Sequence, residues 1–304
     1  MAPTVAVLVN PTSGKGKGGR SAPEIGELLH RHGIDAAILV AGSAAESLQM
    51  ARKAVADGVD ALVAAGGDGT VNLALQAVAN TNVPLAIIPV GTGNDNARLL
   101  GLPKDDIAAC VQVIADFNVR TIDVGHVRTD AGDELYFMGV MSSGFDSCVN
   151  ETANKMKFPK GESRYFIGIL KELGTFKPLP YTVTVDGVPT KGLGMLVAVG
   201  NGTSYGGGMQ VCAGAKPDDG LLTVTWLHEV GKVTFLRVFP RVYKGTHITH
   251  PSVTQMTGKV IRLDAPGQIV YADGERVGPL PAEATIHENA LKVLVPAGSD
   301  LGHK

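Results

Sequence analysis

Short hydrophobic runs alternate with amphipathic segments over roughly the first 125 residues. The runs are bounded by Gly, Pro or Asn, which is typical of buried strands, and the segments between them have apolar residues at helical spacing. The predicted strands are 5–10, 35–40, 61–65, 84–89 and 119–124, and the predicted helices are 23–31, 44–56 and 106–117. This alternation predicts a Rossmann-like parallel α/β domain with helices on both faces of the sheet.

After Gly125 the pattern changes, because strand-like runs follow one another without regular helices between them. The runs are 135–140, 181–185, 194–199, 221–227, 260–263, 268–272, 285–287 and 291–295, with predicted helices at 164–173 and 232–243. This succession of strand-like runs predicts an antiparallel β-sandwich domain. A chain of 304 residues also exceeds the usual size of a single core. We therefore expect an α/β domain over 1–125 and a β-rich domain over 126–288.

The predicted strand 61–65 runs into Gly66-Gly-Asp-Gly-Thr70, after which Thr70 or Asn72 is expected to begin a helix. Glycine lets the backbone approach a phosphate, and a helix N-terminus presents unpaired N–H groups to it. The Asp68 carboxylate would repel a phosphate unless a cation lies between them, most simply Mg2+. The alternative interpretation is a tight turn with one solvated aspartate.

The next strand ends in Gly91-Thr-Gly-Asn-Asp95, which repeats this arrangement. Thr92 can donate to a phosphate or a ribose, and Asn94 can orient Asp95. Because the carboxyl ends of parallel strands meet at one edge of a sheet, Asp68 and Asp95 should share a cation or divide metal binding and catalysis between them. The alternative role for Asp95 is to cap the following helix.

The turn after the first strand, Asn10 to Ser21, contains Gly14, Gly16 and Gly19 in a literal G-x-G-x-x-G. The acidic residue of a dinucleotide site is missing at the end of the second strand, and Arg20 stands where a P-loop needs lysine. Neither motif is therefore satisfied. The basic glycine loop still suits a polyphosphate, with short polar side chains at Asn10, Thr12 and Ser13. A flexible basic loop without a ligand is the alternative.

Three stretches of the second domain contain candidate chemistry. The glycine-dense run Asn201–Met209 predicts close approach to a ligand or to another backbone segment. The run Ala215–Leu222 contains Asp-Asp-Gly, which by itself is an ordinary turn. Tyr271–Glu275 contains Asp-Gly, a hairpin signal, so Glu275 is either a catalytic carboxylate or a solvated side chain.

Composition narrows the classes of function. A net charge of −2 argues against nucleic-acid binding, which needs a strongly basic surface. The three cysteines are isolated and lack metal-binding spacing, so we expect buried thiols in a reducing compartment. The sequence shows neither a leader pattern nor an apolar run long enough for a membrane span. These features predict a cytoplasmic protein.

The segment 156–171 interleaves aromatic and aliphatic residues with basic ones. Between Glu151 and Lys177 there are six Lys or Arg and three Glu, a local charge of +3. Such a segment is suited to the anionic inner face of a membrane. An ordinary amphipathic core helix with solvated lysines is an equally good interpretation.

Taken together, the motifs resemble the diacylglycerol kinase catalytic-domain family, and most closely its soluble bacterial lipid kinases. They occur in order along the chain: Asn10–Gly14, Gly66–Thr70, Pro89–Asp95, Gly144–Asp146, Tyr205–Met209, Asp218–Leu221 and Asp273–Glu275. The resemblance implies two domains with the active site in the cleft between them, the first domain being completed by 289–304. It also implies that Glu275 is the general base. Two departures from the family pattern are Gly93, at a variable position, and the Ser142-Ser143 pair, which affects the shape of the pocket.

The resemblance further implies a structural Mg2+ bound by the Lys216 and Leu221 carbonyls and the Asp219 carboxylate. The expected activity is ATP- and Mg2+-dependent phosphorylation of diacylglycerol or a similar lipid to phosphatidic acid, with Glu275, Asp68 and Asp95 as catalytic residues. The expected nucleotide site consists of Asn10, Pro11, Thr12, Ser13, Gly14, Gly66, Gly67, Asp68, Gly69, Thr70, Val71, Asn72, Gly91, Thr92 and Asn94.

A soluble-metabolite kinase of the NAD kinase type is the alternative, because it shares the Gly-Gly-Asp-Gly-Thr turn. It would not explain Asp273-Gly-Glu275 or the Tyr-Gly-Gly-Gly-Met run. The expected partner is a lipid substrate at an anionic membrane surface, with peripheral attachment and no nucleic acid. The sequence leaves open whether the chain forms a homodimer.

Overall fold

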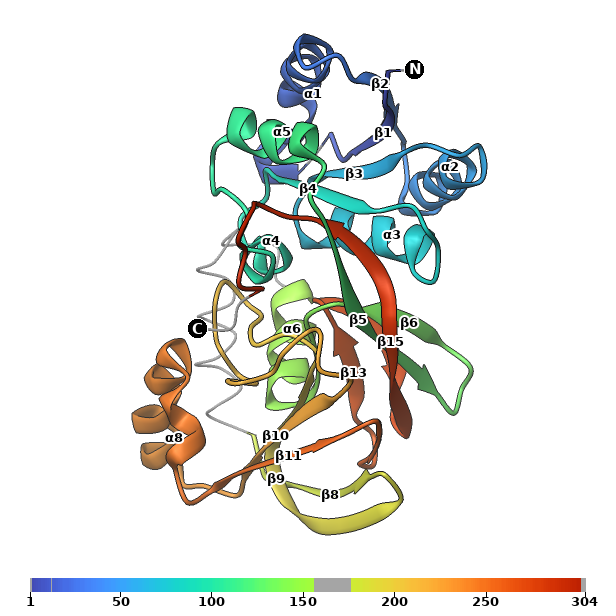
Figure 1. Cartoon of the computed structure of the whole chain (residues 1–304). Coiled ribbons are helices and arrows are strands. Elements are labelled where there is room, and N and C mark those ends of the chain that lie inside the picture. Colours follow the sequence, from blue (N-terminus) through green and yellow to red (C-terminus); the bar gives the residue numbers. More distant parts are fainter. Residues whose placement is uncertain (1, 12, 156–175, 302–304) are drawn as a thin grey trace. The chain divides into compact units, whose positions relative to one another are not determined.

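The computed structural model describes residues 2–11, 13–155 and 176–301 of the chain (Figure 1). Their contacts divide the chain into two compact units. Unit 1 consists of Met1–Val124, Lys216–Asp219 and His287–Lys304, and unit 2 consists of Gly125–Ala215 and Gly220–Ile286. The long strands β5 (Val119–Thr129) and β15 (Ala282–Leu294) pass from one unit into the other.

Unit 1 is built on a parallel sheet in the order β15-β4-β3-β1-β2. The bounds of the four shorter strands are β1 Thr4–Val9, β2 Asp35–Val40, β3 Ala61–Gly66 and β4 Leu85–Pro89. Every residue of β3 and β4 is buried, which explains why their sequences are continuous apolar runs without alternation. The parallel sheet predicted from the sequence is thus confirmed.

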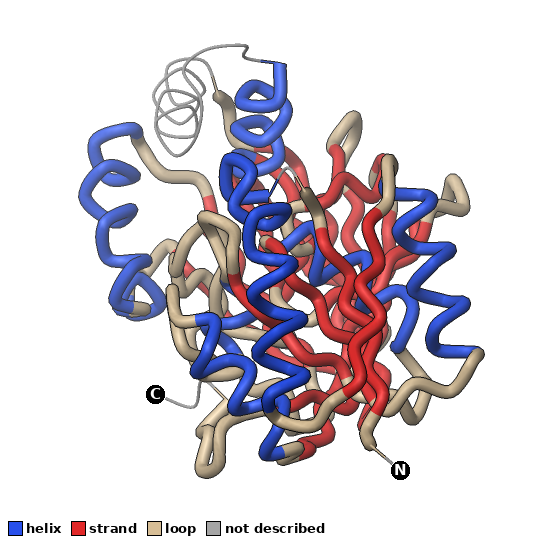
Figure 2. The backbone as a smooth tube through the Cα atoms, turned by 90° about the horizontal axis from the view of Figure 1, so that it is seen from above, coloured by secondary structure: helices blue, strands red, loops and turns tan. Residues whose placement is uncertain are grey.

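Helices cover both faces of this sheet (Figure 2). Helices α1 (Ser13–Arg31) and α5 (Ile107–Asp116) pack against each other, and α2 (Ala44–Ala56) packs against α3 (Asp68–Val78). The short helix α4 (Asp95–Leu99) follows β4. The core between the sheet and α1 and α5 contains Val7, Val63, Ile88, Ile25 and Ile114.

Helix α1 begins at Ser13, which corrects the prediction of a glycine loop followed by a helix over 23–31. Glycine lowers helix propensity, so the local pattern favoured a loop. Packing overrides that preference: a Cβ at Gly18 would lie 2.3 Å from the Asn10 carbonyl oxygen, so only glycine lets the helix lie this close to the preceding turn. The polar residues at 10–13 therefore lie at a helix N-terminus rather than in a long loop.

Unit 2 is built from mainly antiparallel strands in the order β14-β13-β7-β9-β8-β12-β15, with β10 between β9 and β11, and with β5 paired to β6. The bounds are β6 Glu134–Phe137, β7 Val140–Gly144, β8 Leu179–Val185, β9 Val188–Gly200, β10 Leu222–His228, β11 Val253–Gly258, β12 Val260–Asp264, β13 Ile269–Ala272 and β14 Glu275–Pro279. The core contains the fully buried rings of Phe137, Tyr181 and Trp226. The predicted β-sandwich-like class is confirmed.

Some elements of unit 2 differ from the predicted ones. The predicted strand 135–140 is two strands, β6 and β7. The two predicted strands 285–287 and 291–295 belong to the single strand β15, which ends at Leu294. Helix α6 (Phe145–Lys155) was not predicted, because its sequence has no continuous apolar stripe. The predicted helix 232–243 is α8 (Lys232–Val238) continued by the 3-10 helix η1 (Phe239–Lys244), and η2 (Thr246–Thr249) follows. The predicted helix 164–173 lies outside the described residues.

Within the described parts of the chain, no helix combines the length and apolar character that crossing a membrane requires.

Candidate functional site

In unit 1, the turns that follow β1, β3 and β4 meet at the carboxyl end of the sheet. A Cβ built on Gly67 would lie 3.3 Å from the Gly91 Cα and 3.6 Å from the Ser13 hydroxyl oxygen. A Cβ on Gly91 would lie only 2.4 Å from the Gly67 Cα, so position 91 requires glycine and position 67 has little room for a side chain. The close approach of these backbones leaves N–H groups uncovered by side chains, which is the arrangement that phosphate-binding turns use.

Helix α3 begins at Asp68 with Gly67 as its N-cap, which corrects the expectation that Thr70 or Asn72 would begin it. Thr70 and Asn72 are instead buried inside the first turns, where the Asn72 side-chain oxygen accepts a hydrogen bond from Gln76. The helix begins earlier because the glycine turn itself supplies its first N–H groups. Asp68 therefore lies in the first turn, where the helix dipole favours a negative charge.

The Asp68 carboxylate accepts a hydrogen bond from the Asn96 backbone N–H at 3.2 Å. Burial raises the pKa of Asp68, and the charge of Asp95 raises it further, while the backbone N–H groups of Asn94, Asp95 and Asn96 oppose the rise. Burial and the neighbouring negative charge both disfavour the ionised form of Asp68, and a bound cation would favour it.

Asp95 is the first residue of α4, and Asn94 precedes it in the left-handed region with φ 54° and without a side-chain cap bond. Asp95 therefore does not cap the helix, and Asn94 donates to the Gly91 carbonyl oxygen at 3.0 Å. The Asp95 carboxylate pairs with Arg98. A Cβ on Gly93 would lie 2.7 Å from Asp68 Oδ2 and 3.7 Å from Asp95 Oδ2, so both carboxylates face the same spot.

Two polar atoms in these turns are buried without a hydrogen-bond partner among the described residues, namely Thr70 Oγ1 and Asn94 Oδ1. Such groups are rare unless a ligand or water completes them. Ser13 is held by a hydrogen bond from its N–H to the Asn10 carbonyl. Thr92 is exposed, and Val71 is buried in α3. Thr12 lies outside the described residues.

Asp123 on β5 was missed as a candidate from the sequence. It is 3% exposed, and its carboxylate accepts a hydrogen bond from the Asn289 N–H at 2.7 Å, while its own N–H donates to the Pro217 carbonyl at 2.7 Å. Asp123 thus ties β5 to the C-terminal segment and to the Lys216–Asp219 stretch within unit 1. An aspartate among the apolar residues 122–124 was the available signal.

The predicted metal site at Lys216, Asp219 and Leu221 stays a prediction. The Arg120 guanidinium nitrogen lies 3.7 Å from a carboxylate oxygen of Asp218, so the acidic side chain next to Asp219 faces a positively charged side chain. Among the described residues, no cluster of three or more His, Cys, Asp or Glu side chains is arranged to hold a metal ion. Any ion at Asp68 and Asp95 would therefore need further ligands from a substrate or from water.

In unit 2, Glu275 is the first residue of β14 and follows a two-residue hairpin turn. Asp273 and Gly274 both have positive φ, 49° and 83°, which is the pattern of a type I′ turn. The Asp273 carboxylate accepts hydrogen bonds from the backbone N–H groups of Met138, Gly139 and Val140 at 2.8, 3.0 and 3.0 Å. Asp273 therefore attaches this hairpin, on which Glu275 lies, to the connection between β6 and β7.

The Glu275 residue is exposed, yet the surrounding protein withdraws enough water from its carboxyl group to raise its pKa. Two neighbours of Glu275 on the hairpin bond to another element: Tyr271 and Arg276 both donate to Glu151 of α6, at 2.6 and 3.2 Å. The arrangement places a reachable carboxylate of raised basicity on a rigid turn. Proton acceptance from a hydroxyl is chemistry that such a group can perform.

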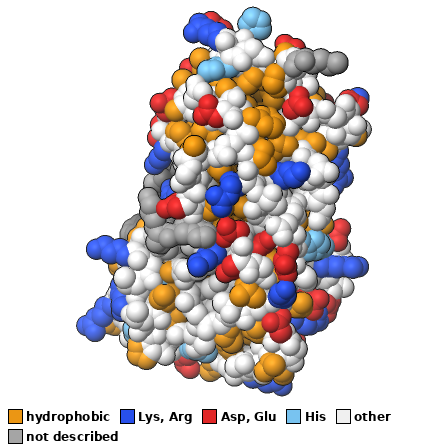
Figure 3. Space-filling model, viewed as in Figure 1, with side chains coloured by type: hydrophobic (Ala, Val, Ile, Leu, Met, Phe, Trp, Pro, Cys, Tyr) orange, Lys and Arg blue, Asp and Glu red, His pale blue; other side chains and the backbone are white. Residues whose placement is uncertain are grey.

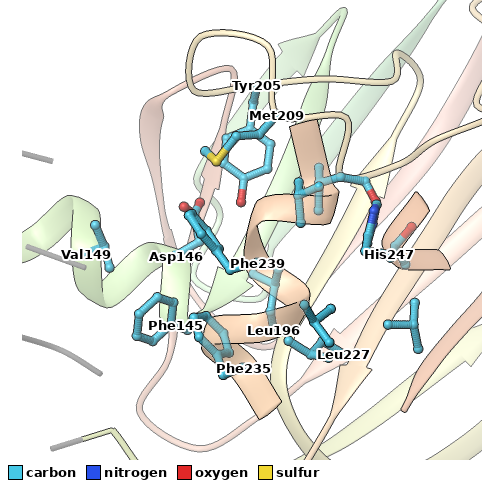
Figure 4. A pocket seen from close by; sticks show the side chains of 15 residues that line it. Phe145, Asp146, Val149, Leu196, Tyr205, Met209, Leu227, Phe235, Phe239 and His247 are labelled. Atoms are coloured by element: carbon cyan, nitrogen blue, oxygen red, sulfur yellow. The ribbon is translucent and has the colours of Figure 1, made fainter. Parts of the chain in front are cut away.

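Unit 2 also contains an apolar pocket (Figure 4). It encloses about 680 Å³ of space not filled by protein atoms, part of it open to solvent. The lining residues are Phe145, Asp146, Val149, Leu196, Tyr205, Met209, Val211, Thr225, Leu227, Phe235, Val238, Phe239, Val242, His247 and Val253. Its mainly apolar lining is that of a site for a mainly apolar ligand.

The glycine-rich run predicted to approach a ligand forms one wall of this pocket. Tyr205 and Met209 pair through two backbone hydrogen bonds of 3.1 and 3.0 Å, and the three glycines between them all have positive φ. This tight loop directs both side chains to the pocket (Figure 4). On another wall, Ser142 donates to the buried Asp146 carboxylate at 2.7 Å, so this serine of the pair holds the acidic side chain of the lining.

Comparisons with known proteins agree with these two units. A model of the diacylglycerol kinase catalytic domain matches residues 4–127, and a model of the YegS C-terminal NAD kinase beta sandwich-like domain matches residues 139–295. A diacylglycerol kinase of Mycobacterium tuberculosis is 42% identical over 294 residues, covering 96% of this chain and 95% of that protein.

Solved structures show the same fold. The crystal structure of a diacylglycerol kinase from Bacillus anthracis has a TM-score of 0.73 and 21% identity, covering 98% of both chains. An NAD kinase from Archaeoglobus fulgidus, solved in complex with ATP, has a TM-score of 0.54 and 16% identity, covering 97% of this chain and 93% of that one. The resemblance indicated by the motifs is confirmed. The chain therefore belongs to the diacylglycerol kinase family.

Proposed function

We propose that this kinase transfers the γ-phosphoryl group of ATP to the hydroxyl of diacylglycerol or a closely similar lipid at a membrane surface, giving phosphatidic acid and ADP. The observation that supports a lipid as the substrate is the apolar pocket of unit 2. Aromatic and aliphatic side chains form most of its wall, so burying acyl chains there is favourable by about 25 cal/mol per Å². A dinucleotide such as NAD offers the pocket no comparable apolar surface.

One polar group in the wall suits a glycerolipid. The Asp146 carboxylate is 6% exposed and has one oxygen bonded to Ser142 Oγ. A polar end of the ligand would lie more favourably near this carboxylate than against the apolar rest of the wall. We expect the chains to fill the apolar part and the glycerol end to lie near Asp146.

The glycine turns of unit 1 fit the triphosphate. Gly67 and Gly91 give backbone access, and Thr70 Oγ1 and Asn94 Oδ1, which have no hydrogen-bond partner among the described residues, can bond to a ligand or water. An NAD kinase of the same fold was solved with ATP, which supports the same donor here. Asp68 and Asp95 would hold Mg2+ through their carboxylates, in keeping with its preference for one or two carboxylates plus substrate phosphates. When bound, the ion would neutralise charge on the transferred phosphoryl group.

Glu275 is proposed as the general base. The lipid oxygen forms the new P–O bond, the β–γ bridging bond breaks and ADP leaves, and the hydroxyl proton passes to the Glu275 carboxylate. The raised pKa of this carboxyl makes it a better proton acceptor than an ordinary surface glutamate. Its fixed hairpin limits the rearrangement needed to reach the hydroxyl.

The test is phosphorylation of defined acceptors with radiolabelled ATP and Mg2+. Purified protein is offered dioleoylglycerol in mixed micelles, and NAD in a parallel reaction, with chromatographic identification of the products. The expected result is labelled phosphatidic acid and no labelled NADP. Labelled NADP without any lipid product would instead establish the metabolite-kinase alternative. A Leu196→Trp variant, which narrows the pocket, should lose lipid turnover while keeping nucleotide binding.

A further inference from the structure

The segment formed by α8 and η1 has apolar residues on two faces. Its inner face lines the pocket through Phe235, Val238, Phe239 and Val242. Its other face, here called the outer face and defined as Lys232, Val233, Leu236, Arg237, Tyr243 and Lys244, is exposed throughout. Five of these positions, 233, 236, 237, 243 and 244, follow helical spacing and so share one side of the segment, and Lys232 adjoins them.

The apolar exposure of the outer face is concentrated. Val233, Leu236 and Tyr243 are 64%, 51% and 52% exposed, and they are three of the nine large hydrophobic side chains that are exposed among the described residues. Exposed apolar residues scattered singly need no explanation, whereas a group on one helical face marks an interaction site. The outer face is therefore a candidate docking surface.

The charge of the segment indicates which partner it fits. Lys232, Arg237, Arg241 and Lys244 lie on it, and the sequence from Val230 to Leu263 contains no Asp or Glu. In Figure 3, Lys and Arg side chains project at the lower left of the view, where α8 lies in Figure 1. This positive charge belongs to a chain whose net charge is −2, so the basic character is local.

We propose that the outer face of α8–η1 docks on an anionic phospholipid bilayer, an inference that rests on the lipid substrate proposed above. Apolar side chains enter the interface between headgroups and acyl chains, and the neighbouring basic residues are attracted to anionic headgroups. The pocket lies directly beneath the same segment, so a lipid leaving the bilayer would pass from the outer face to the inner one. A second copy of this chain is disfavoured as the partner, because two like basic faces would repel each other.

The test uses two double variants and matched controls. Val233→Ser with Leu236→Ser removes the apolar contact, and Arg237→Gln with Lys244→Gln removes two charges. Arg241 is left unchanged, because it bonds Thr246 and Thr249 and so holds η1 to η2. Control variants are Val188→Ser with Leu193→Ser, which are 68% and 46% exposed in the same unit, and Lys191→Gln.

Sedimentation with phosphatidylglycerol–phosphatidylcholine vesicles that contain no diacylglycerol measures docking independently of catalysis. We expect each double variant to lower vesicle partitioning about tenfold or more. The charge variant should lose most at low salt, where electrostatic attraction is least screened. The controls should sediment like the wild type, and all variants should phosphorylate a short-chain diacylglycerol dispersed as monomers.

Wild-type partitioning by both double variants would overturn the inference, as would a homodimer that the Val233→Ser, Leu236→Ser variant dissociates. Strong vesicle binding by a wild-type protein that phosphorylates no lipid would refute the proposed function and leave the docking surface standing. Lipid turnover by the wild type, together with unchanged vesicle binding by the variants, would refute the docking surface and leave the proposed function standing. The two proposals therefore fail separately.

Discussion

Gly93 lies so close to Asp68 that a Cβ at position 93 would stand 2.7 Å from Asp68 Oδ2. Gly93 departs from the family motif at a variable position, and the sequence alone gave it little weight. The structure gives it a role, because Asp68 is also fixed on its other oxygen by the Asn96 N–H and has little freedom to move aside. A side chain at position 93 must therefore displace either the Asp68 carboxylate or the backbone at position 93.

We predict that Gly93→Ala lowers kcat by about tenfold or more, because small misplacements of a carboxylate proposed to hold the metal ion are costly. Steady-state kinetics with saturating ATP measures the effect. Gly26→Ala is the matched control, since its nearest neighbour would be the flexible Ile38 side chain at 3.9 Å. Equal kcat values for the two variants would show that Asp68 does not need its present position.

Asp68→Asn should lower kcat by at least about a hundredfold, because the amide keeps the shape and removes the charge that holds a cation. Stability should not suffer. The pKa of Asp68 is raised in the folded state, so above the unfolded-state pKa the ionised carboxylate disfavours folding. The neutral amide removes that penalty, and Tm at pH 7 should be unchanged or higher. A variant that is inactive and also unfolded would mean that Asp68 is structural.

Glu275→Gln should lower kcat by about a hundredfold or more and leave the KM for ATP nearly unchanged, as expected for loss of a general base. The wild-type kcat should fall on the acid side of its pH profile, as the Glu275 carboxyl becomes protonated. Because its pKa is raised, this fall begins at a higher pH than for an ordinary glutamate. The acid limb should disappear in the variant. Intact kcat with weakened ATP binding would make Glu275 a nucleotide or metal contact.

Met209→Trp should discriminate between lipids by chain length. Met209 is 5% exposed and lines the pocket, so a larger ring would occupy space proposed for an acyl chain. We expect the KM for dioleoylglycerol to rise about tenfold while that for dibutyrylglycerol stays similar. Leu193→Trp, on an exposed position outside the pocket, is the control. An equal rise for both lipids would place the chains elsewhere.

Asp273→Asn should destabilise the protein by about 2–3 kcal/mol, because one carboxylate receives three backbone N–H groups and the amide replaces it incompletely. Denaturant unfolding measures the change. Asp264→Asn, on an exposed residue at the end of β12, is the control. A variant as stable as the wild type would show that the β6–β7 connection does not depend on this carboxylate.

The sequence by itself determined the parallel sheet of unit 1 and the two glycine turns that follow β3 and β4. The strands 61–65 and 84–89 are recognisable because burial on both faces demands a continuous apolar run, a property of each segment alone. The turn at Gly66–Thr70 is recognisable for the same reason, since glycine content is local. The hairpin at Asp273-Gly also followed from two adjacent residues.

Only the tertiary structure decided features that depend on residues far apart in the chain. The early start of α1 required the approach of Gly18 to Asn10, and the roles of Gly93 and Asp273 required contacts with Asp68 and with Met138–Val140. The pocket brings α6, the Tyr205–Met209 loop and α8–η1 together across some hundred residues of sequence. No periodicity encodes such a cavity, because its shape is set by how separate elements pack and not by the conformation of any one of them.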